Sequence, residues 1–219
     1  MELNGKKVLF LGDSITEGVG ASCVENAYWQ VFGRNTGAIV KGYGISGTCI
    51  APQIAPGPEG SESYAQYFGS RVEGMDPEAD VVVVFGGTND FGHGDAPLGS
   101  MADREETSFY GSLHCLCRKL LTKYPTAEVV FMTPLHRGGE EAPINEHGIR
   151  NVTNLAGYVQ AIREVAEYYA IPVLDLYRLH GVIPSIPVLR ETYMPDWLHP
   201  SDAGHARIAS RLEGFLKTL

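Results

Sequence analysis

Basic side chains are scarce in this chain of 219 residues. Its 17 lysines and arginines stand against 26 aspartates and glutamates, which gives a formal net charge of −9. Proteins that bind nucleic acid or anionic lipid need a basic surface. We therefore expect no nucleic acid among its partners and no electrostatic attraction to a membrane.

Long hydrophobic runs are also absent. No apolar stretch approaches the roughly 20 residues that a membrane-spanning helix requires. The first residues, Met1–Lys7, lead directly into an expected strand, with no separate apolar signal segment or small-residue cleavage site. These features predict a cytoplasmic protein without membrane insertion.

Cysteine is sparse and irregularly spaced, which excludes a disulfide framework of the kind found in small secreted proteins. Cys115-Leu116-Cys117 could begin a metal site, but no second cysteine pair accompanies it, and His93-Gly94-Asp95 lacks an evident third ligand. We expect free, mostly buried thiols, no bound metal and no cofactor. The cysteines are Cys23, Cys49, Cys115 and Cys117.

The chain does contain alternating strand-like and helix-like segments. Val81–Phe85 is apolar at every position, which is typical of a central parallel strand covered on both faces. Apolar residues recur at spacings of three and four in the expected helices. The expected strands are Lys7–Leu11, Ala38–Lys41, Asp80–Phe85, Glu128–Met132 and Ile171–Leu176; the expected helices are Glu105–Tyr124, Asn151–Ala170 and Ser201–Leu219.

This alternation predicts right-handed crossovers and a three-layer α/β/α sandwich with a doubly wound sheet. We find no repeat or linker, so residues 1–219 are expected to form a single domain. Exposed sheet edges and apolar loops would be compatible with a homo-oligomer. Four connections are unusually long, which is typical of functional loops; they are Tyr43–Gly60, Gly86–Ser100, Pro134–Arg150 and Tyr177–Pro200.

A serine follows the first expected strand, in Gly12-Asp13-Ser14, where open α/β sheets meet their ligands. Near the other end of the chain, Asp196-Trp197-Leu198-His199 places a carboxylate three residues before an imidazole. In a helical or 3₁₀ turn, this spacing lets the carboxylate meet one ring nitrogen and leaves the other for the serine. Serine, histidine and aspartate are the groups that nucleophilic acyl transfer needs.

Donors for a developing oxyanion lie in the loops after the second and third expected strands. Glycine in Ile45-Ser46-Gly47 lets a backbone N–H approach a ligand closely, and Asn89 carries a neutral amide. The nearby Asp13 and Asp90 are expected to fix these loops as hydrogen-bond acceptors, because aspartate favours turns.

Four blocks in this order resemble the SGNH subgroup of the GDSL esterase/lipase family: Gly12-Asp13-Ser14, Ile45-Ser46-Gly47, Gly87-Thr88-Asn89-Asp90 and Asp196-x-x-His199-Pro200. The resemblance covers nearly the whole chain. It implies a flavodoxin-like sheet of five parallel strands, with Ser14 as nucleophile, His199 as base and Asp196 as the residue that orients it. It also implies an oxyanion hole formed by the Ser14 and Gly47 N–H groups and the Asn89 side chain. Relatives commonly carry asparagine where this chain has Gly42, which would loosen the loop that carries Gly47.

The predicted function is metal-independent hydrolysis of a small carboxylic ester through an acyl-enzyme. The absence of a large lid favours a short acyl group, such as acetate on a carbohydrate hydroxyl. The apolar segment Gly181–Leu189 could instead line a longer acyl pocket, as in a lysophospholipase or thioesterase.

A non-catalytic, flavodoxin-like ligand-binding module is the alternative of another class. Gly42-x-Gly44-x-x-Gly47 matches a dinucleotide fingerprint, but Pro52, Pro56 and Pro58 follow where the required helix would begin. Asp13 and Glu17 would repel a flavin phosphate beside Ser14. The sequence therefore favours catalysis over nucleotide binding.

Overall fold

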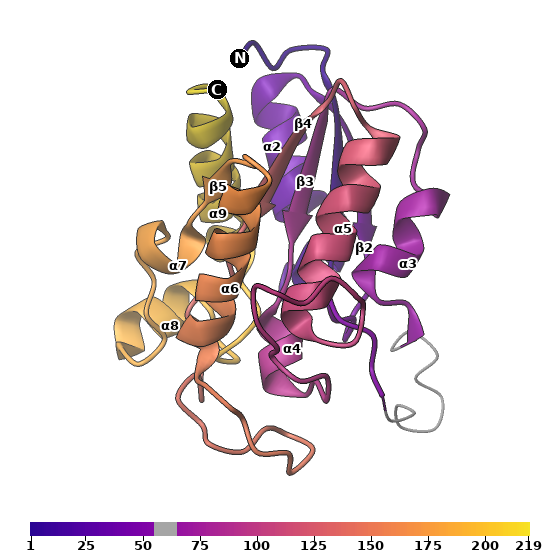
Figure 1. Cartoon of the computed structure of the whole chain (residues 1–219). Coiled ribbons are helices and arrows are strands. Elements are labelled where there is room, and N and C mark those ends of the chain that lie inside the picture. Colours follow the sequence, from indigo (N-terminus) through magenta and orange to yellow (C-terminus); the bar gives the residue numbers. More distant parts are fainter. Residues whose placement is uncertain (55–64) are drawn as a thin grey trace.

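The computed structural model describes residues 1–54 and 65–219. Within them, a five-stranded parallel sheet has the order β2-β1-β3-β4-β5, flanked by helices on both faces (Figure 1). This is the three-layer α/β/α fold expected from the sequence. The strands are β1 (Lys7–Gly12), β2 (Ile39–Gly44), β3 (Val81–Phe85), β4 (Glu128–Met132) and β5 (Val173–Leu174).

The helices connect the strands and cover the two faces of the sheet. They are α1 (Ser14–Glu17), α2 (Tyr28–Thr36), α3 (Phe68–Arg71), α4 (Thr88–Gly92), α5 (Phe109–Lys123), α6 (Leu155–Tyr168), α7 (Leu176–Leu179), α8 (Pro187–Tyr193) and α9 (Asp202–Leu216). None of the helices in the described residues is long and apolar enough to cross a membrane.

The three interior strands β1, β3 and β4 contribute side chains to both hydrophobic cores. Alternate side chains of a strand point to opposite faces, so Leu9 and Val82 pack with α5 and α6, whereas Phe10 and Val83 pack with α2 and α9. The helices α5 and α6 cover one face of the sheet, and α2 and α9 cover the other (Figure 1). All of β3 is buried, as its uninterrupted apolar sequence predicts. Burial on both faces holds the carboxyl ends of β1 and β3 in fixed positions.

Some boundaries differ from the expectations. The last strand is shorter than predicted, because the Asp175 side chain accepts a hydrogen bond from Arg178 N and starts α7. The expected loops 86–100 and 177–200 contain α4 and α8. Part of the expected loop 43–60 lies outside the described residues. The four cysteines are free thiols, and Cys23 alone among them is exposed.

The strand order places a topological switch point between β1 and β3. The connection from β1 leads outward to β2, whereas β3 leads the other way to β4 and β5. A crevice at the carboxyl ends of two such strands is where doubly wound sheets bind ligands. Ser14 follows β1 and Asn89 follows β3, so both lie at this crevice.

Candidate active site

The nucleophile candidate Ser14 is the first residue of the short helix α1. The Asp13 side chain caps this helix by accepting a hydrogen bond from Ile15 N at 3.0 Å. A side chain at Gly12 would lie 1.9 Å from the hydroxyl oxygen of Thr16, so only glycine permits this tight exit from β1. The sequence Gly-Asp-Ser thus turns the chain sharply and leaves the Ser14 hydroxyl at the rim of the sheet.

Asp196 and His199 lie in an irregular turn between α8 and α9. The expectation of a helical or 3₁₀ turn is wrong: Trp197 has a left-handed backbone with φ of +71°. This conformation lets one carboxylate oxygen of Asp196 accept from Leu198 N at 2.9 Å and His199 N at 2.6 Å. The turn is therefore held by the carboxylate itself.

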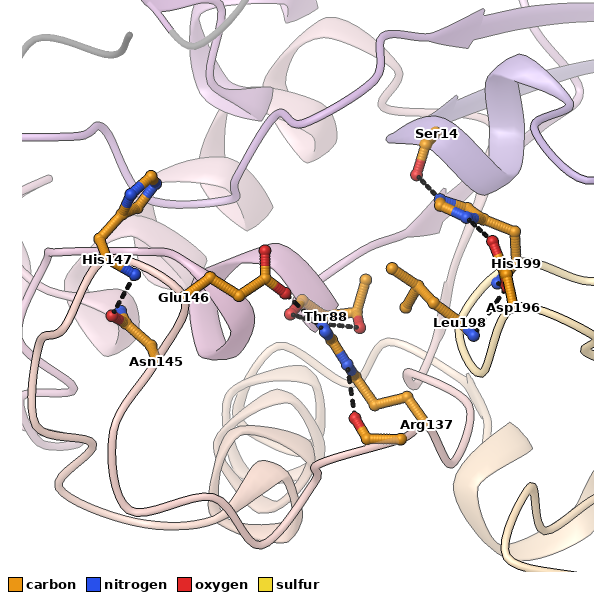
Figure 2. A network of polar contacts seen from close by, with 10 residues as sticks. Ser14, Thr88, Arg137, Asn145, Glu146, His147, Asp196, Leu198 and His199 are labelled. Carbon is orange, nitrogen blue, oxygen red and sulfur yellow. Dashed lines mark hydrogen bonds and ion pairs between the residues drawn. The ribbon is translucent and has the colours of Figure 1, made fainter.

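The structure brings Ser14, His199 and Asp196 into one hydrogen-bonded chain (Figure 2). Ser14 Oγ lies 3.0 Å from His199 Nε2, and His199 Nδ1 lies 2.6 Å from the second carboxylate oxygen of Asp196. An ionised carboxylate can only accept, so it selects the tautomer with hydrogen on Nδ1 and leaves Nε2 to accept from Ser14.

Asp196 is ionised over a wide pH range. Partial burial raises the pKa of its carboxyl, but hydrogen bonds from Leu198 N–H and from the His199 side chain and backbone outweigh burial and hold the pKa below its usual value. The group that faces the imidazole therefore keeps its negative charge at neutral pH.

Three potential oxyanion donors border the same crevice. The Asn89 amide donates to Thr48 O at 3.0 Å through one of its two N–H bonds, which leaves the second N–H for a ligand. Ser14 N and Gly47 N have no backbone or side-chain acceptor in residues 1–54 and 65–219. Gly47 adopts φ of +75°, a conformation that glycine tolerates best.

The loop that carries Gly47 is held by contacts that the sequence patterns did not reveal. Glu17, at the end of α1, accepts hydrogen bonds from both the backbone and the hydroxyl of Ser46. The Trp29 indole covers Gly42, where a side chain would lie 2.7 Å from the ring. The loosening expected from glycine at position 42 is thus opposed by close packing.

Asp13 and Asp90 fix loops, as predicted. Asp90 accepts hydrogen bonds from Ile50 N and Ala51 N, both at 2.9 Å. Burial raises the pKa of Asp90 to about 6 despite these N–H donors. Burial likewise raises the pKa of Asp13 to about 7; the Ile15 N–H opposes this rise, and nearby Asp90 adds to it.

These buried carboxyls predict a specific pH dependence of stability. The pKa of Asp13 in the folded protein, about 7, exceeds its ordinary value of 3.8, so ionisation favours unfolding. Wild type should lose stability relative to Asp13→Asn as the pH rises from about 4 to about 7, by at most about 4 kcal/mol. Denaturant unfolding across this range measures the difference.

Asp80→Asn is the control for this prediction. The hydrogen bond from Lys6 lowers the pKa of Asp80, so its ionised form stabilises the fold. The Asp80→Asn variant should show the opposite trend, losing stability relative to wild type as the pH rises through the range where Asp80 ionises. Parallel pH curves for wild type and Asp13→Asn would contradict the assignment of a raised pKa to Asp13.

Arg137 connects the loop after β4 to the helix that carries Asn89 (Figure 2). Its guanidinium donates to Thr88 O at 3.2 Å and forms an ion pair with Glu146 at 2.9 Å. Glu146 N in turn donates to Gly92 O, at the end of α4, at 2.9 Å. The loop is therefore fastened to both ends of α4, a role for Arg137 that no sequence motif indicated.

Two cavities adjoin the Asp196–His199 turn. A small apolar cavity of about 10 Å³, lined by residues that include Ile15, Thr88 and Leu198, lies against the Ser14 turn. A wider one of about 380 Å³ lies between Trp197, residues 137–142 and residues 183–185.

A serine, a histidine and an aspartate are hydrogen-bonded in sequence at the switch point of this three-layer α/β/α fold, an arrangement that hydrolases with a serine nucleophile use. The model of the GDSL-like lipase/acylhydrolase family matches residues 10–207. The chain belongs to this family.

Solved structures share the fold. A protein from Lactobacillus plantarum is 32% identical, with a TM-score of 0.82 and coverage of 99% of this chain and 98% of that one. A lipase/acylhydrolase from Enterococcus faecalis is 19% identical, with a TM-score of 0.67 and coverage of 97% and 96%. A two-domain esterase active on acetylated mannans is 22% identical, with a TM-score of 0.64 and coverage of 99% and 49%. Comparison with curated proteins finds no match.

Proposed function

We propose that this hydrolase cleaves carboxylic esters with Ser14 as the nucleophile, His199 as the general base and Asp196 as the residue that orients the imidazole. The observation that carries this proposal is the chain of contacts from Ser14 Oγ to His199 Nε2 at 3.0 Å and from His199 Nδ1 to Asp196 at 2.6 Å. These distances lie within reach for proton transfer without rearrangement of the turn.

In the first half of the reaction, Ser14 Oγ attacks the ester carbonyl carbon and its proton passes to His199 Nε2. The carbonyl oxygen becomes an oxyanion, which the Ser14 and Gly47 N–H groups and the Asn89 amide stabilise. The bond to the alcohol then breaks as His199 protonates the leaving oxygen. A water molecule then loses a proton to His199 and attacks the acyl carbon. The bond from the acyl carbon to Ser14 Oγ breaks, His199 returns the proton to Ser14, and the carboxylic acid leaves.

We propose a short acyl group, with acetate on a carbohydrate hydroxyl as the substrate class. The fold is shared with the esterase active on acetylated mannans, and this likeness supports a small acyl group.

Longer acyl chains are the second candidate, as in a lysophospholipase or thioesterase. Ile183, Ile186 and Val188 are 42%, 44% and 66% exposed on the segment that precedes the Asp196–His199 turn. Apolar side chains on one segment at the rim of a site favour contact with an alkyl chain.

Two measurements test these proposals. A fluorophosphonate probe should label wild type at Ser14, identified by peptide mass mapping, and should leave Ser14→Ala unlabelled. Hydrolysis rates for p-nitrophenyl esters of 2 to about 12 carbons, with acetylated xylo-oligosaccharides alongside, should then be highest for acetate. Rates that rise with chain length would favour the second candidate, and labelling at another residue would contradict the mechanism.

Removal of an oxyanion donor should slow the reaction strongly. Asn89→Ala should lower kcat by about 10²–10³-fold with a smaller effect on KM, because the second amide N–H acts mainly on the charge that develops in the transition state. Steady-state kinetics with p-nitrophenyl acetate measure this. Asn26→Ala, which removes an amide bonded to Ser22 and Asp202, should retain the parent rate. An equal loss in both variants would contradict the role of Asn89.

A further inference from the structure

Arg71 lies behind the proposed oxyanion hole, outside the four sequence blocks. It ends α3, and its guanidinium donates to Gly12 O at 3.1 Å, Tyr43 O at 2.6 Å and Thr48 Oγ1 at 3.0 Å. Gly12 ends β1 two residues before Ser14, whereas Tyr43 and Thr48 flank the loop that carries Gly47. One planar cation therefore joins the strand end that precedes Ser14 to the loop that carries Gly47.

The same contacts extend to the third donor. Thr48, whose hydroxyl accepts from Arg71, also accepts the Asn89 amide through its backbone carbonyl at 3.0 Å. The guanidinium thus contacts a residue close to each of the three proposed donors. Gly12 lies two residues before Ser14, Thr48 follows Gly47 directly, and Thr48 also accepts the Asn89 amide.

Contribution to stability alone is a poor explanation for this arrangement. Arg71 forms no ion pair with a carboxylate within residues 1–54 and 65–219, and its buried Nε has no hydrogen-bond partner there. Burial lowers the pKa of Arg71 to about 10, although the charge of Asp13 opposes this shift, and Arg71 is cationic at neutral pH. Burying a cation without a bonded counter-ion is costly, so we expect a role for Arg71 beyond stability.

We infer that Arg71 is a positioning residue for the oxyanion hole: its three-way contact with Gly12, Tyr43 and Thr48 sets the relative placement of the Ser14, Gly47 and Asn89 donors. The inference rests on the proposed function. Its physical basis is that an oxyanion hole stabilises charge only when its donors are held in place before the charge appears. A planar fork of N–H groups provides such a hold, whereas the lysine ammonium is a point charge on a flexible stem.

Kinetics of Arg71→Met and Arg71→Lys test the inference. Arg71→Met should lower kcat for p-nitrophenyl acetate by about 10–100-fold while KM changes by less than about threefold, because misplaced donors weaken transition-state binding more than substrate binding. The kcat of Arg71→Lys should lie between the values for wild type and Arg71→Met. The control is Lys123→Met, which removes a cation that donates to Val72 O, Glu73 O and Met75 O in the segment next to Arg71 without contacting the site.

A double-mutant cycle separates positioning from general destabilisation. In the Asn89→Ala background, Arg71→Met should cost several-fold less in kcat than in wild type, because one of the donors that Arg71 places is already gone. Equal losses in both backgrounds, or equal losses in Arg71→Met and Lys123→Met, would overturn the inference. If Arg71→Met does not fold, Arg71→Lys is carried through the same cycle and decides the question.

A separate variant distinguishes failure of the proposed function from failure of the role of Arg71. Ser14→Ala assayed alongside with the same substrate tests the nucleophile without reference to Arg71. Parent turnover in Ser14→Ala would reject the mechanism itself, whereas inactive Ser14→Ala with unaffected Arg71→Met would reject only the positioning role.

Discussion

Ser14→Ala should lower kcat by about 10⁶-fold, to the level that binding and the oxyanion donors alone provide. In the proposed mechanism the Ser14 hydroxyl forms the acyl-enzyme, and without it His199 Nε2, which lies 3.0 Å from Ser14 Oγ, has no proton to accept. Hydrolysis of p-nitrophenyl acetate measures the loss, and far-ultraviolet circular dichroism checks that the fold persists.

A double variant tests whether Ser14 and His199 act together. In the proposed mechanism Ser14 and His199 act on a single proton, so the double variant Ser14→Ala, His199→Ala should be no slower than Ser14→Ala alone. Ser22→Ala, which removes a hydroxyl that donates to Asp202 and forms no bond to Ser14, Asp196 or His199, should keep the parent rate. Additive losses in the double variant would show that the two residues act independently and would contradict the proton transfer.

Asp196→Asn should lower kcat by about 10³–10⁴-fold without unfolding the turn. The amide oxygen can still accept from Leu198 N and His199 N, so the backbone arrangement is retained. The amide NH₂, however, faces His199 Nδ1 and must donate to it. The ring then carries its hydrogen on Nε2 and cannot accept the Ser14 proton.

Two controls sharpen this prediction. Asp202→Asn alters a carboxylate that begins α9 and accepts from Ser22 and Asn26, and it should leave kcat within about twofold. Fluorophosphonate labelling of Asp196→Asn should slow in parallel with turnover, because both reactions need the Ser14 proton to leave. Labelling of Asp196→Asn at the parent rate would contradict the proposal that Asp196 orients His199 to accept the Ser14 proton.

Much of the fold follows from patterns that the sequence displays openly. The uninterrupted apolar run Val81–Phe85 predicts a strand buried on both faces, and the helical spacing within Glu105–Tyr124 predicts the helix observed at Phe109–Lys123. The apolar run Ile171–Leu176 predicts a longer strand than the observed Val173–Leu174, because the run does not reveal that the Asp175 side chain caps a helix. Local side-chain capping competes with hydrophobic pattern at such boundaries.

Sequence motifs indicated the candidate site residues, but they did not indicate the side chains that hold the loops of the site in place. Short motifs pointed to Ser14, Asn89 and His199, because each follows a strand at the same rim. Glu17 and Arg137 could not be found this way, since the role of each depends on which distant backbone carbonyl or N–H lies within about 3 Å of its side chain.

The sequence by itself determined which chemical groups this protein brings to the carboxyl edge of its sheet: a hydroxyl, an imidazole, a carboxylate and an amide, each after a strand or before the last helix. Only the tertiary structure decided that Ser14 and His199, 185 positions apart, lie 3.0 Å from one another, and that the Asp196 turn is irregular at Trp197. The physical reason is that periodicity and motif spacing report local backbone preferences. Distances between remote side chains depend on how the helices pack on both faces of the sheet and on single long-range contacts such as those of Arg71.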